Sequence, residues 1–476
     1  MTKPNVLLFL TDGHRADALG CYGNPVLRTP YLDALAREGV RFTGSFSAHT
    51  VCMPSRASIF TGRYPHVHGV WANGIPLSRS EVTLAQVLAE NGYRTGAFGK
   101  IHFEPQQAAD YPPALDREES YYGFQEVRLS ENKMGPDYLA FVDEHYPDLS
   151  EAVRSRQPVP EEAHQITWIT DQAMDFIGRN AGGTQPFFCF CSYHELIPPS
   201  HSPEEYTGRY RPEDMPEPKR REGELDAKPP YLKDCYEGSL RMRNEAHAIL
   251  PYPDDETLRR YLASYYDMAT FLDHQFGRLA ASLQEHSLWD DTIVLFTSDH
   301  GLCLNDHWQW RHGPFLYDQV MNVPMIWRVP GMTRPGQVDD SLVESVDIMP
   351  TILDLAGVEV PAGVQGRSIR LLLAQETGAQ GRDSVLGQDR ESPELMARGV
   401  DPTGHEVKAL RTREWKLIHY PGRPYGELYD LINDPDEFEN LWAKPRYAGK
   451  RQEMERLLLE RLCAAEDPLP QRRHMW

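Results

Sequence analysis

A cysteine stands where the sequence favours the start of a helix, with a proline and an arginine shortly after it. The segment is residues 50–63, TVCMPSRASIFTGR. Pro54 suits the first turn of a helix, where its missing N–H is not needed. Cys52 would then lie at the helix N-terminus, where backbone amides favour an anion, and Arg56 would add a positive charge on the same side. These residues could form a nucleophile beside an oxyanion site, or equally a buried free cysteine near a helix cap.

Two apolar segments end in acidic residues. Residues 5–11 lead into Asp12, and residues 292–298 lead into Asp299 and His300. Such runs suit parallel strands buried on both faces, and ligand sites in open α/β sheets form at the carboxyl ends of the strands. We therefore expect the two acids to meet at one sheet edge, although they could be unrelated strand-end residues. Carboxylates with one imidazole suit a divalent metal ion, calcium first and manganese next.

Five motifs, taken along the chain, resemble those of the formylglycine-dependent sulfatases. This family belongs to the alkaline phosphatase-like superfamily and includes arylsulfatases and phosphonate monoester hydrolases. The motifs are Thr11-Asp12; Cys52-Met53-Pro54-Ser55-Arg56 with Thr61-Gly62-Arg63; Gly99-Lys100-Ile101-His102; Ser298-Asp299-His300-Gly301; and Glu427-Leu428-Tyr429-Asp430 with Asn433-Asp434-Pro435 and Asn440-Leu441. The resemblance covers nearly the whole chain.

The resemblance implies a catalytic apparatus built round Cys52. In that family a formylglycine-generating enzyme oxidises the cysteine to an aldehyde, whose hydrate supplies the nucleophilic hydroxyl. The residues carried over are Asp12, Cys52, Asp299 and His300 as metal ligands, and Arg56, Lys100 and His102 as catalytic residues, the last two also binding the substrate.

The resemblance implies the cleavage of a sulfate ester, and the implied mechanism is chemically consistent. A divalent cation lowers the pKa of the attacking hydroxyl, and positive groups neutralise the non-bridging oxygens as charge develops. A general acid then protonates the leaving oxygen. The second hydroxyl of the hydrate releases sulfate by re-forming the aldehyde, which a serine or cysteine ester could not do.

The chain departs from the family pattern at three places. Many sulfatases have two adjacent acids where this chain has Asp12-Gly13, and the phosphonate monoester hydrolases also lack the second acid. A histidine is usual where Ile197 stands, and isoleucine can neither donate a proton nor hold an anion. A lysine is expected before Gly-Pro, where this chain has Arg311-His312-Gly313-Pro314.

Two histidines could compensate for these departures. His312 is the candidate catalytic acid, because the pKa of an imidazole can be set near the working pH; its alternative is a structural loop histidine. His194 lies close to Ile197 in the sequence and is a candidate substrate-binding residue, as is His201 with a local shift.

Apolar strands alternate with amphipathic helices along most of the chain, which predicts an α/β fold with a large, doubly wound mixed sheet flanked by helices. The expected strands are residues 5–11, 40–47, 93–98, 186–193, 292–298 and 323–329, and the expected helices 30–38, 83–91, 161–180, 258–283 and 348–355. Thr29 and Gly39 read as the caps of the first helix. Residues 104–160 and 200–230 read as irregular segments that shape access to the site.

The character changes after about residue 373. Short strands at 408–420 and 426–430 precede a helix at 450–464. We expect a catalytic domain over residues 1–373 and a smaller α+β subdomain, an antiparallel sheet with a helix, over residues 374–476.

Composition excludes several classes of protein. The chain has 476 residues, a formal net charge of −21 and seven cysteines, so neither a basic nucleic-acid-binding face nor a disulfide framework is expected. No segment has the length and apolarity of a membrane span or a signal peptide. These features predict a cytoplasmic protein without membrane contact. The tail, residues 468–476, could dock on a second copy in a homo-oligomer.

The sequence thus predicts a metal-dependent hydrolase of small sulfate esters. Gly13 and the Asp299-His300 pair favour, as an alternative, a phosphonate monoester hydrolase or phosphodiesterase with the same nucleophile. Ile197 motivates a second alternative, a non-catalytic anion-binding homologue. The leaving group, whether aryl, alkyl or sugar, is left open.

Overall fold

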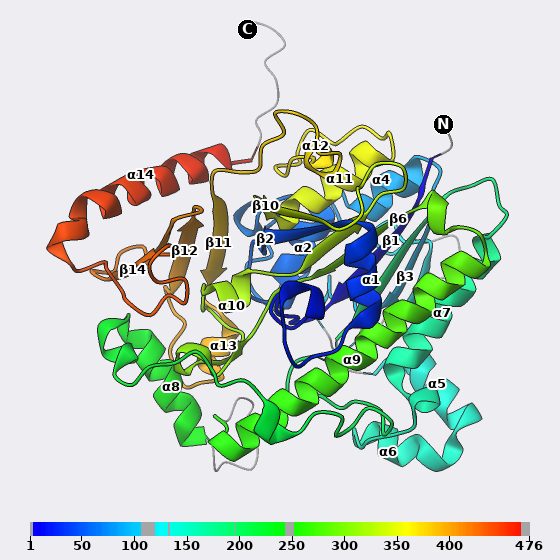
Figure 1. Ribbon diagram of the computed structural model, residues 1–476, viewed down its shortest axis with the longest axis horizontal. Coiled ribbons are helices and arrows are strands. Elements are labelled where there is room, and N and C mark those ends of the chain that lie inside the picture. The colour runs from blue at the N-terminus through cyan, green and yellow to red at the C-terminus, as the bar shows by residue number, and fades with distance from the viewer. Residues whose placement is uncertain (1–2, 106–119, 132–133, 195, 243–251, 468–476) are drawn as a thin grey trace, which may run out of the picture.

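Eight strands form the central sheet of the computed structural model, which describes residues 3–105, 120–131, 134–194, 196–242 and 252–467 (Figure 1). The strand order is β10-β2-β9-β6-β1-β5-β3-β4. The bounds are β1 Asn5–Thr11, β2 Val40–Phe46, β3 Arg94–Gly99, β4 Glu126–Leu129, β5 Phe187–Tyr193, β6 Thr292–Ser298, β9 Met325–Arg328 and β10 Gln337–Glu344. β9 is antiparallel to both of its neighbours, and the other strand pairs are parallel. The predicted mixed sheet is confirmed.

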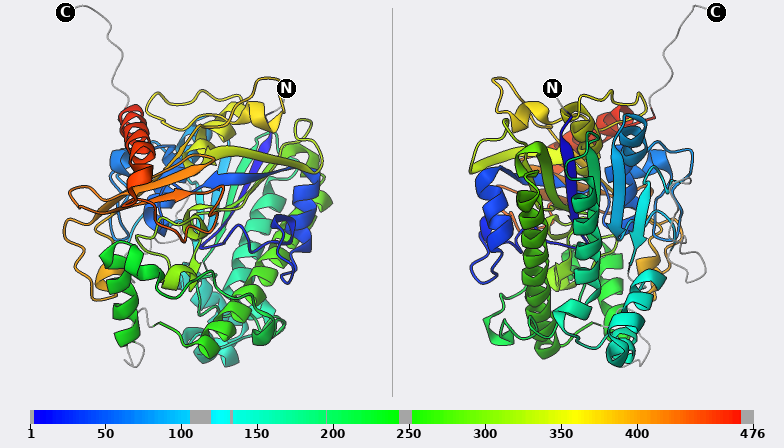
Figure 2. Two further views of the ribbon diagram at one scale, coloured as in Figure 1. Left: turned by 60° about the vertical axis from the view of Figure 1, so that its left-hand side comes forward. Right: turned by 90° about the vertical axis from the view of Figure 1, so that its right-hand side faces the viewer.

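Helices cover both faces of this sheet, as the alternation of buried side chains along β1 requires. Leu7 and Phe9 pack with α1 (Pro30–Glu38), α7 (Gln165–Asn180) and α9 (Asp255–Glu285), which lie along one face (Figure 2). Leu8 and Leu10 point the other way, into a core shared with α2 (Cys52–Thr61), α4 (Leu84–Glu90) and α11 (Ile348–Leu355). The fold is therefore doubly wound.

The prediction that residues 104–160 are irregular is wrong for much of the segment. It contains β4, which pairs with β3 at the sheet edge, and the helices α5 (Pro136–His145) and α6 (Ser150–Arg154). Residues 106–119 and 132–133 lie outside the described residues. The segment 200–230 holds only short 3₁₀ turns, at Pro212–Asp214 and Glu224–Ala227, in agreement with the prediction. Strand β10 and helix α8 (Pro230–Arg241) were not predicted from the sequence.

Both caps assigned to α1 act differently from the expectation. The Thr29 side chain makes no capping hydrogen bond to the helix; Asp273 of α9 instead accepts from the backbone N–H groups of Tyr31 and Leu32, at 3.2 and 2.7 Å. Gly39 has φ −132°, not a left-handed conformation. A Cβ there would lie 2.1 Å from the carbonyl oxygen of Trp327 in β9. Glycine is therefore required by the close approach of two backbones.

A second sheet lies beside the first (Figure 1). It is antiparallel and comprises β11 (Val385–Arg390), β12 (Glu406–Arg411), β13 (Trp415–His419) and β14 (Gly426–Asp430), with α14 (Ala448–Ala464) packed on it. The predicted antiparallel sheet with a helix is thus present, and the division into domains at residue 373 stays a prediction. Residues 468–476 lie outside the described residues.

Across the residues that the structure describes, no helix combines the length and apolarity needed to cross a bilayer.

Candidate active site

Two strand ends bring the first pair of acids together. β1 and β6 are parallel neighbours in which Thr11 pairs with Ser298, so Asp12 and Asp299 leave the sheet side by side. The backbone N–H of Gly13 donates to Oδ1 of Asp299 at 3.2 Å. Both carboxylates are fully buried. The sheet thus joins residues that stand almost 290 positions apart in the sequence.

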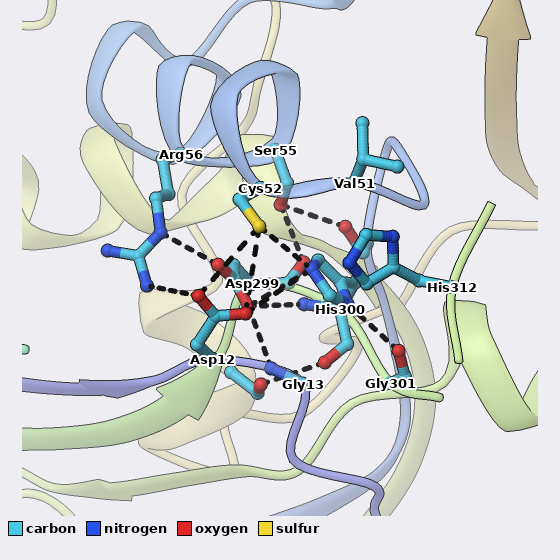
Figure 3. A network of polar contacts seen from close by, with 12 residues as sticks. Asp12, Gly13, Val51, Cys52, Ser55, Arg56, Asp299, His300, Gly301 and His312 are labelled. Carbon is cyan, nitrogen blue, oxygen red and sulfur yellow. Dashed lines mark hydrogen bonds and ion pairs between the residues drawn. The ribbon is translucent and has the colours of Figure 1, made fainter. Parts of the chain in front are cut away.

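Cys52 begins α2 and points at this pair of acids (Figure 3). Its Sγ atom lies 3.6 Å from Oδ1 of Asp12 and 3.4 Å from Nε2 of His300. All of α2 is buried. The N-terminal amides of a helix have no partner within the helix; here the N–H of Met53 donates to Oδ1 of Asn73 at 3.0 Å. The thiol therefore sits at a buried helix N-terminus, in contact with a carboxylate and an imidazole.

Arg56, one turn along α2, connects this helix to residues at the ends of three strands. Its Nε donates to Asp299 Oδ2 at 2.7 Å, and its Nη1 donates to the Lys100 carbonyl and the Ser192 hydroxyl at 2.6 and 2.9 Å. Nη2 is buried 3.9 Å from a carboxylate oxygen of Asp12 and has no hydrogen-bond partner among the described residues. This nitrogen is a donor available to an incoming anion.

Lys100 and His102 follow β3 at the same edge of the sheet. The Lys100 ammonium forms a hydrogen-bonded ion pair with Asp12. His102 has a left-handed backbone, with φ 58°, and its N–H donates to Oε1 of Glu131 at 2.8 Å, as does that of Ile101 at 2.9 Å. Glu131 was missed in the sequence. It follows the short strand β4, so the same strand-end reasoning would have found it had β4 been recognised.

The charges in this cluster shift one another's protonation. Burial alone would raise the pKa of Asp12, but Lys100 and Arg56 outweigh it and hold that pKa well below its usual range. Burial alone would lower the pKa of His300, but Asp299 and Cys52 outweigh it and raise that pKa to about 10. A site that favours a proton on His300 also favours a cation in its place, because a metal binds the neutral imidazole.

The donor set fits a divalent cation. The ligand atoms of Asp12, Cys52, Asp299 and His300 all lie within 4.8 Å of one another and are buried. Nδ1 of His300 donates to the Gly301 carbonyl at 2.8 Å, which leaves Nε2 facing the carboxylates. Two carboxylates with one imidazole suit calcium or manganese by their chemistry.

His312 lies against the same imidazole. Its ring centroid is 4.7 Å from that of His300, edge to face (Figure 3), and it forms a second close group with Cys52 and His300. Burial lowers the pKa of His312 well below its ordinary value, with help from the neighbouring cations His300 and Arg311. The imidazole is therefore neutral in the resting site. Among the predicted histidines, His102 and His194 belong to neither of these two groups.

Two of the departures from the family pattern meet in space. Gly13 has φ +72°, and a Cβ at this position would lie 3.1 Å from Cγ1 of Ile197 and 3.2 Å from Cγ of Leu302. The Ile197 side chain would thus be in tight contact with the Cβ of a second acid at position 13, so the two departures from the family pattern are neighbours in space. His194 directly follows β5 and is buried at the same edge of the sheet.

Comparison with known proteins agrees with this geometry. The sulfatase family model matches residues 4–358, and the model described as N-sulphoglucosamine sulphohydrolase, C-terminal, matches residues 306–464. An arylsulfatase of Clostridium perfringens is 30% identical over 98% of this chain and 95% of its own length. The multifunctional alkaline phosphatase superfamily protein PehA of Trinickia caryophylli is 30% identical over 94% and 93%.

Two solved structures share the fold over almost their whole length. The phosphonate monoester hydrolase SpPMH from Silicibacter pomeroyi superposes with a TM-score of 0.83 at 28% identity, covering 98% of this chain and 96% of that one. A protein solved with its substrate D-glucosamine-2-N,6-O-disulfate gives a TM-score of 0.77 at 23% identity, covering 99% and 100%. The second similarity concerns the fold alone.

Proposed function

The chain belongs to the sulfatase family and is a sulfuric ester hydrolase, and we propose that it cleaves small sulfate esters through a formylglycine made from Cys52. The observation that carries the proposal is the position of Cys52 Sγ, at a buried helix N-terminus 3.6 Å from Asp12 and 3.4 Å from His300. Sγ stands where the oxygens of a formylglycine hydrate would be. That hydrate would supply the attacking hydroxyl, and its second hydroxyl would release sulfate.

The proposed cation site consists of Asp12, Asp299, His300 and the modified residue 52, with calcium expected and manganese as the alternative. When bound, the cation lowers the pKa of the attacking hydroxyl and stabilises charge on the sulfate. A formylglycine-generating enzyme would be the partner in maturation. A cytoplasmic location and a homo-oligomer remain predictions.

Three cationic or polar side chains would hold the sulfate group. Arg56 offers its unpartnered Nη2, and Lys100 carries its ammonium beside Asp12. Burial lowers the pKa of His102 well below the ordinary value, and the nearby charges of Lys100 and Arg56 lower it further. Such preorganised donors stabilise the charge that develops in the transition state. His194 is the further candidate for a contact to the substrate.

His312 would hold the proton for the leaving oxygen. The imidazole is neutral in the resting site, and an anion bound beside it favours the protonated form, because opposite charge raises the pKa of a histidine. The proton would then be transferred from the ring to the departing oxygen.

The proposal is tested on the protein co-expressed with a formylglycine-generating enzyme. Mass spectrometry of the peptide of residues 42–56 should show the aldehyde, and the protein should hydrolyse an aryl sulfate. Cys52→Ala should abolish turnover, whereas Cys463→Ala, at an exposed cysteine, should not. Activity should disappear after chelation and return with Ca²⁺ or Mn²⁺. An unmodified thiol in an active protein would refute the proposed nucleophile.

A phosphonate monoester hydrolase is the second candidate. It is favoured by the similarity to SpPMH and by Gly13, where the side chain of a second acid would crowd Ile197 and Leu302 and would need φ +72°. The ratio of kcat/KM on phenyl phosphonate monoester to that on phenyl sulfate decides between the two. A ratio well above one would replace the first proposal by the second.

A further inference from the structure

Arg311 is a cation without a counter-ion on the loop that carries His312. Its Nε atom is buried without a hydrogen-bond partner, and within the described part of the chain its guanidinium forms no hydrogen bond or ion pair. Burial lowers the pKa of Arg311, and the nearby carboxylate of Glu394 does not make up for it. The protein thus keeps a poorly compensated charge beside the site.

The backbone of Arg311 is held in a conformation that a non-glycine residue rarely adopts. Its φ is 65°, in the left-handed region, which persists outside glycine only where the surroundings impose it. Arg398, only 1% exposed, imposes it here. Its Nη2 donates to the carbonyl of Trp310 at 2.8 Å and to that of His312 at 3.0 Å. One buried arginine therefore fixes the chain on both sides of another.

Arg311 is adjacent to the site through its neighbour in the chain. It directly precedes His312, whose ring centroid lies 4.7 Å from that of His300, and its positive charge helps to lower the pKa of His312. By contrast, Arg56 and Lys100 already pair with Asp299 and Asp12. Arg311 is thus a further cation near the site, one that no carboxylate occupies.

We propose that Arg311 binds a second anionic group of the substrate, a carboxylate or a further sulfate carried near the ester that is cleaved. This rests on the proposed function and narrows its substrate class to dianionic esters. A guanidinium fits both groups through two parallel hydrogen bonds. The Arg311 guanidinium has a buried Nε without an acceptor, so it favours a ligand that supplies both an acceptor and the opposite charge.

The test is binding of stable sulfonates, which mimic the ester without being cleaved. Benzenesulfonate carries one charge, and 3- and 4-sulfobenzoate carry a second at two spacings. Isothermal titration of the calcium-loaded protein should show at least one sulfobenzoate binding about 10-fold or more tighter than benzenesulfonate, the gain expected of a charge-assisted hydrogen bond. Arg311→Gly should remove this preference, and Arg311→Lys should retain part of it. Arg413→Gly, at an exposed arginine, is the matched control and should keep the preference.

The outcomes separate the alternatives. Wild type without the preference, or Arg311→Gly with it intact, overturns the proposal. An equal loss for all three sulfonates in Arg311→Gly also overturns it, because Arg311 would then hold the sulfonyl group itself. Glycine relaxes the left-handed backbone, and Arg311→Gln repeats the test with a side chain of similar length. Failure of the matured wild type to hydrolyse both phenyl sulfate and the dianionic 4-carboxyphenyl sulfate would refute the proposed function alone, since binding of sulfonates needs no turnover.

Discussion

At the scale of single residues, the site depends on side chains that form hydrogen bonds with several residues at the same time. Arg56 binds Asp299 through one nitrogen and the Lys100 carbonyl and Ser192 through another. Its planar fork cannot be replaced by the point charge of lysine. The sequence indicated that Arg56 would share a helix face with Cys52, and the structure places it there. The contact with Ser192 could not be predicted, because nothing local marks a strand-end serine as a partner for a distant arginine.

His312 is expected to matter most for substrates with a poor leaving group. His312→Gln should lower kcat/KM about 100- to 10,000-fold on phenyl sulfate, the range found for general acids, and far less on 4-nitrophenyl sulfate, whose phenolate leaves without a proton. The measurement is the dependence of log(kcat/KM) on the pKa of the phenol across a series of aryl sulfates. The slope should become steeper in the variant and stay unchanged in His145→Gln, at an exposed histidine of α5. Parallel lines would assign the proton to another group.

At the scale of elements, buried strands were predicted better than edge strands. β1, β5 and β6 are continuous apolar runs and lie in the middle of the sheet. β4 and β10 lie at its two edges; β4 has only four residues, two of them charged, and the first half of β10 is polar and partly exposed. β10 is also interrupted between Asp339 and Leu342, where its pairing with β2 shifts register. An edge strand that is very short, as β4 is, or polar and irregular, as β10 is, lacks the periodicity on which prediction from sequence depends.

The approach of Gly39 to β9 can be tested with one methyl group. Gly39→Ala should lower the free energy of unfolding by about 1–3 kcal/mol or more, as overpacking does, because its Cβ would meet the Trp327 carbonyl at 2.1 Å. Gly363→Ala is the control, since its Cβ would meet nothing within 4 Å. Urea unfolding followed by tryptophan fluorescence measures both. Equal midpoints for the two variants would contradict the packing argument.

The cap that α9 provides for α1 should make stability depend on pH. Burial raises the pKa of Asp273 to about 7, despite the two N–H groups that it accepts, whereas an unfolded aspartate titrates near about 3.9. Between these values the folded chain binds more protons, so this stabilisation is complete below about pH 4 and is lost as the pH rises through about 7. The loss should exceed about 1 kcal/mol, since each unit of pKa shift corresponds to about 1.4 kcal/mol.

Asp273→Asn keeps an acceptor oxygen but cannot titrate. Its unfolding free energy should therefore change less than that of wild type between about pH 5 and 8. Asp255→Asn, at an exposed carboxylate of the same helix, should follow wild type. Identical slopes for wild type and Asp273→Asn would place the pH dependence elsewhere.

At the scale of the whole molecule, one buried carboxylate ties the two sheets together. Glu344, at the end of β10, is fully buried. Its oxygens accept from Tyr64 beyond α2 at 2.5 Å, from the backbone of Leu386 in β11 at 2.7 Å and from Arg461 of α14 at 2.6 Å, and lie 2.9 Å from Arg382. The sequence predicted the two sheets but not the contacts of Glu344 that join them, because the residues involved lie on four separate segments of the chain.

Removing that charge should weaken both parts at once. Glu344→Gln removes the carboxylate partner of Arg461 and leaves Arg382 with Asp347 alone. It should lower the free energy of unfolding by about 3–5 kcal/mol, the usual result of breaking a buried pair. Glu460→Gln, in an exposed pair with Arg456, should change it by about 0–1 kcal/mol. Loss of aryl sulfatase activity and of tryptophan fluorescence should shift to lower urea together. Activity that survives while the fluorescence change moves would show that the sheets unfold independently.

The complete burial of α2 has a consequence for the order of events during synthesis. Cys52 ends in a site closed by His300, which stands 248 positions later in the chain. At a synthesis rate of about 5–20 residues per second, roughly 12–50 s separate the two residues at the ribosome. During that interval β6 does not exist and the thiol has not been enclosed. The proposed modification of Cys52 would therefore have to take place while the chain is still being made or before it folds, and it would compete with folding.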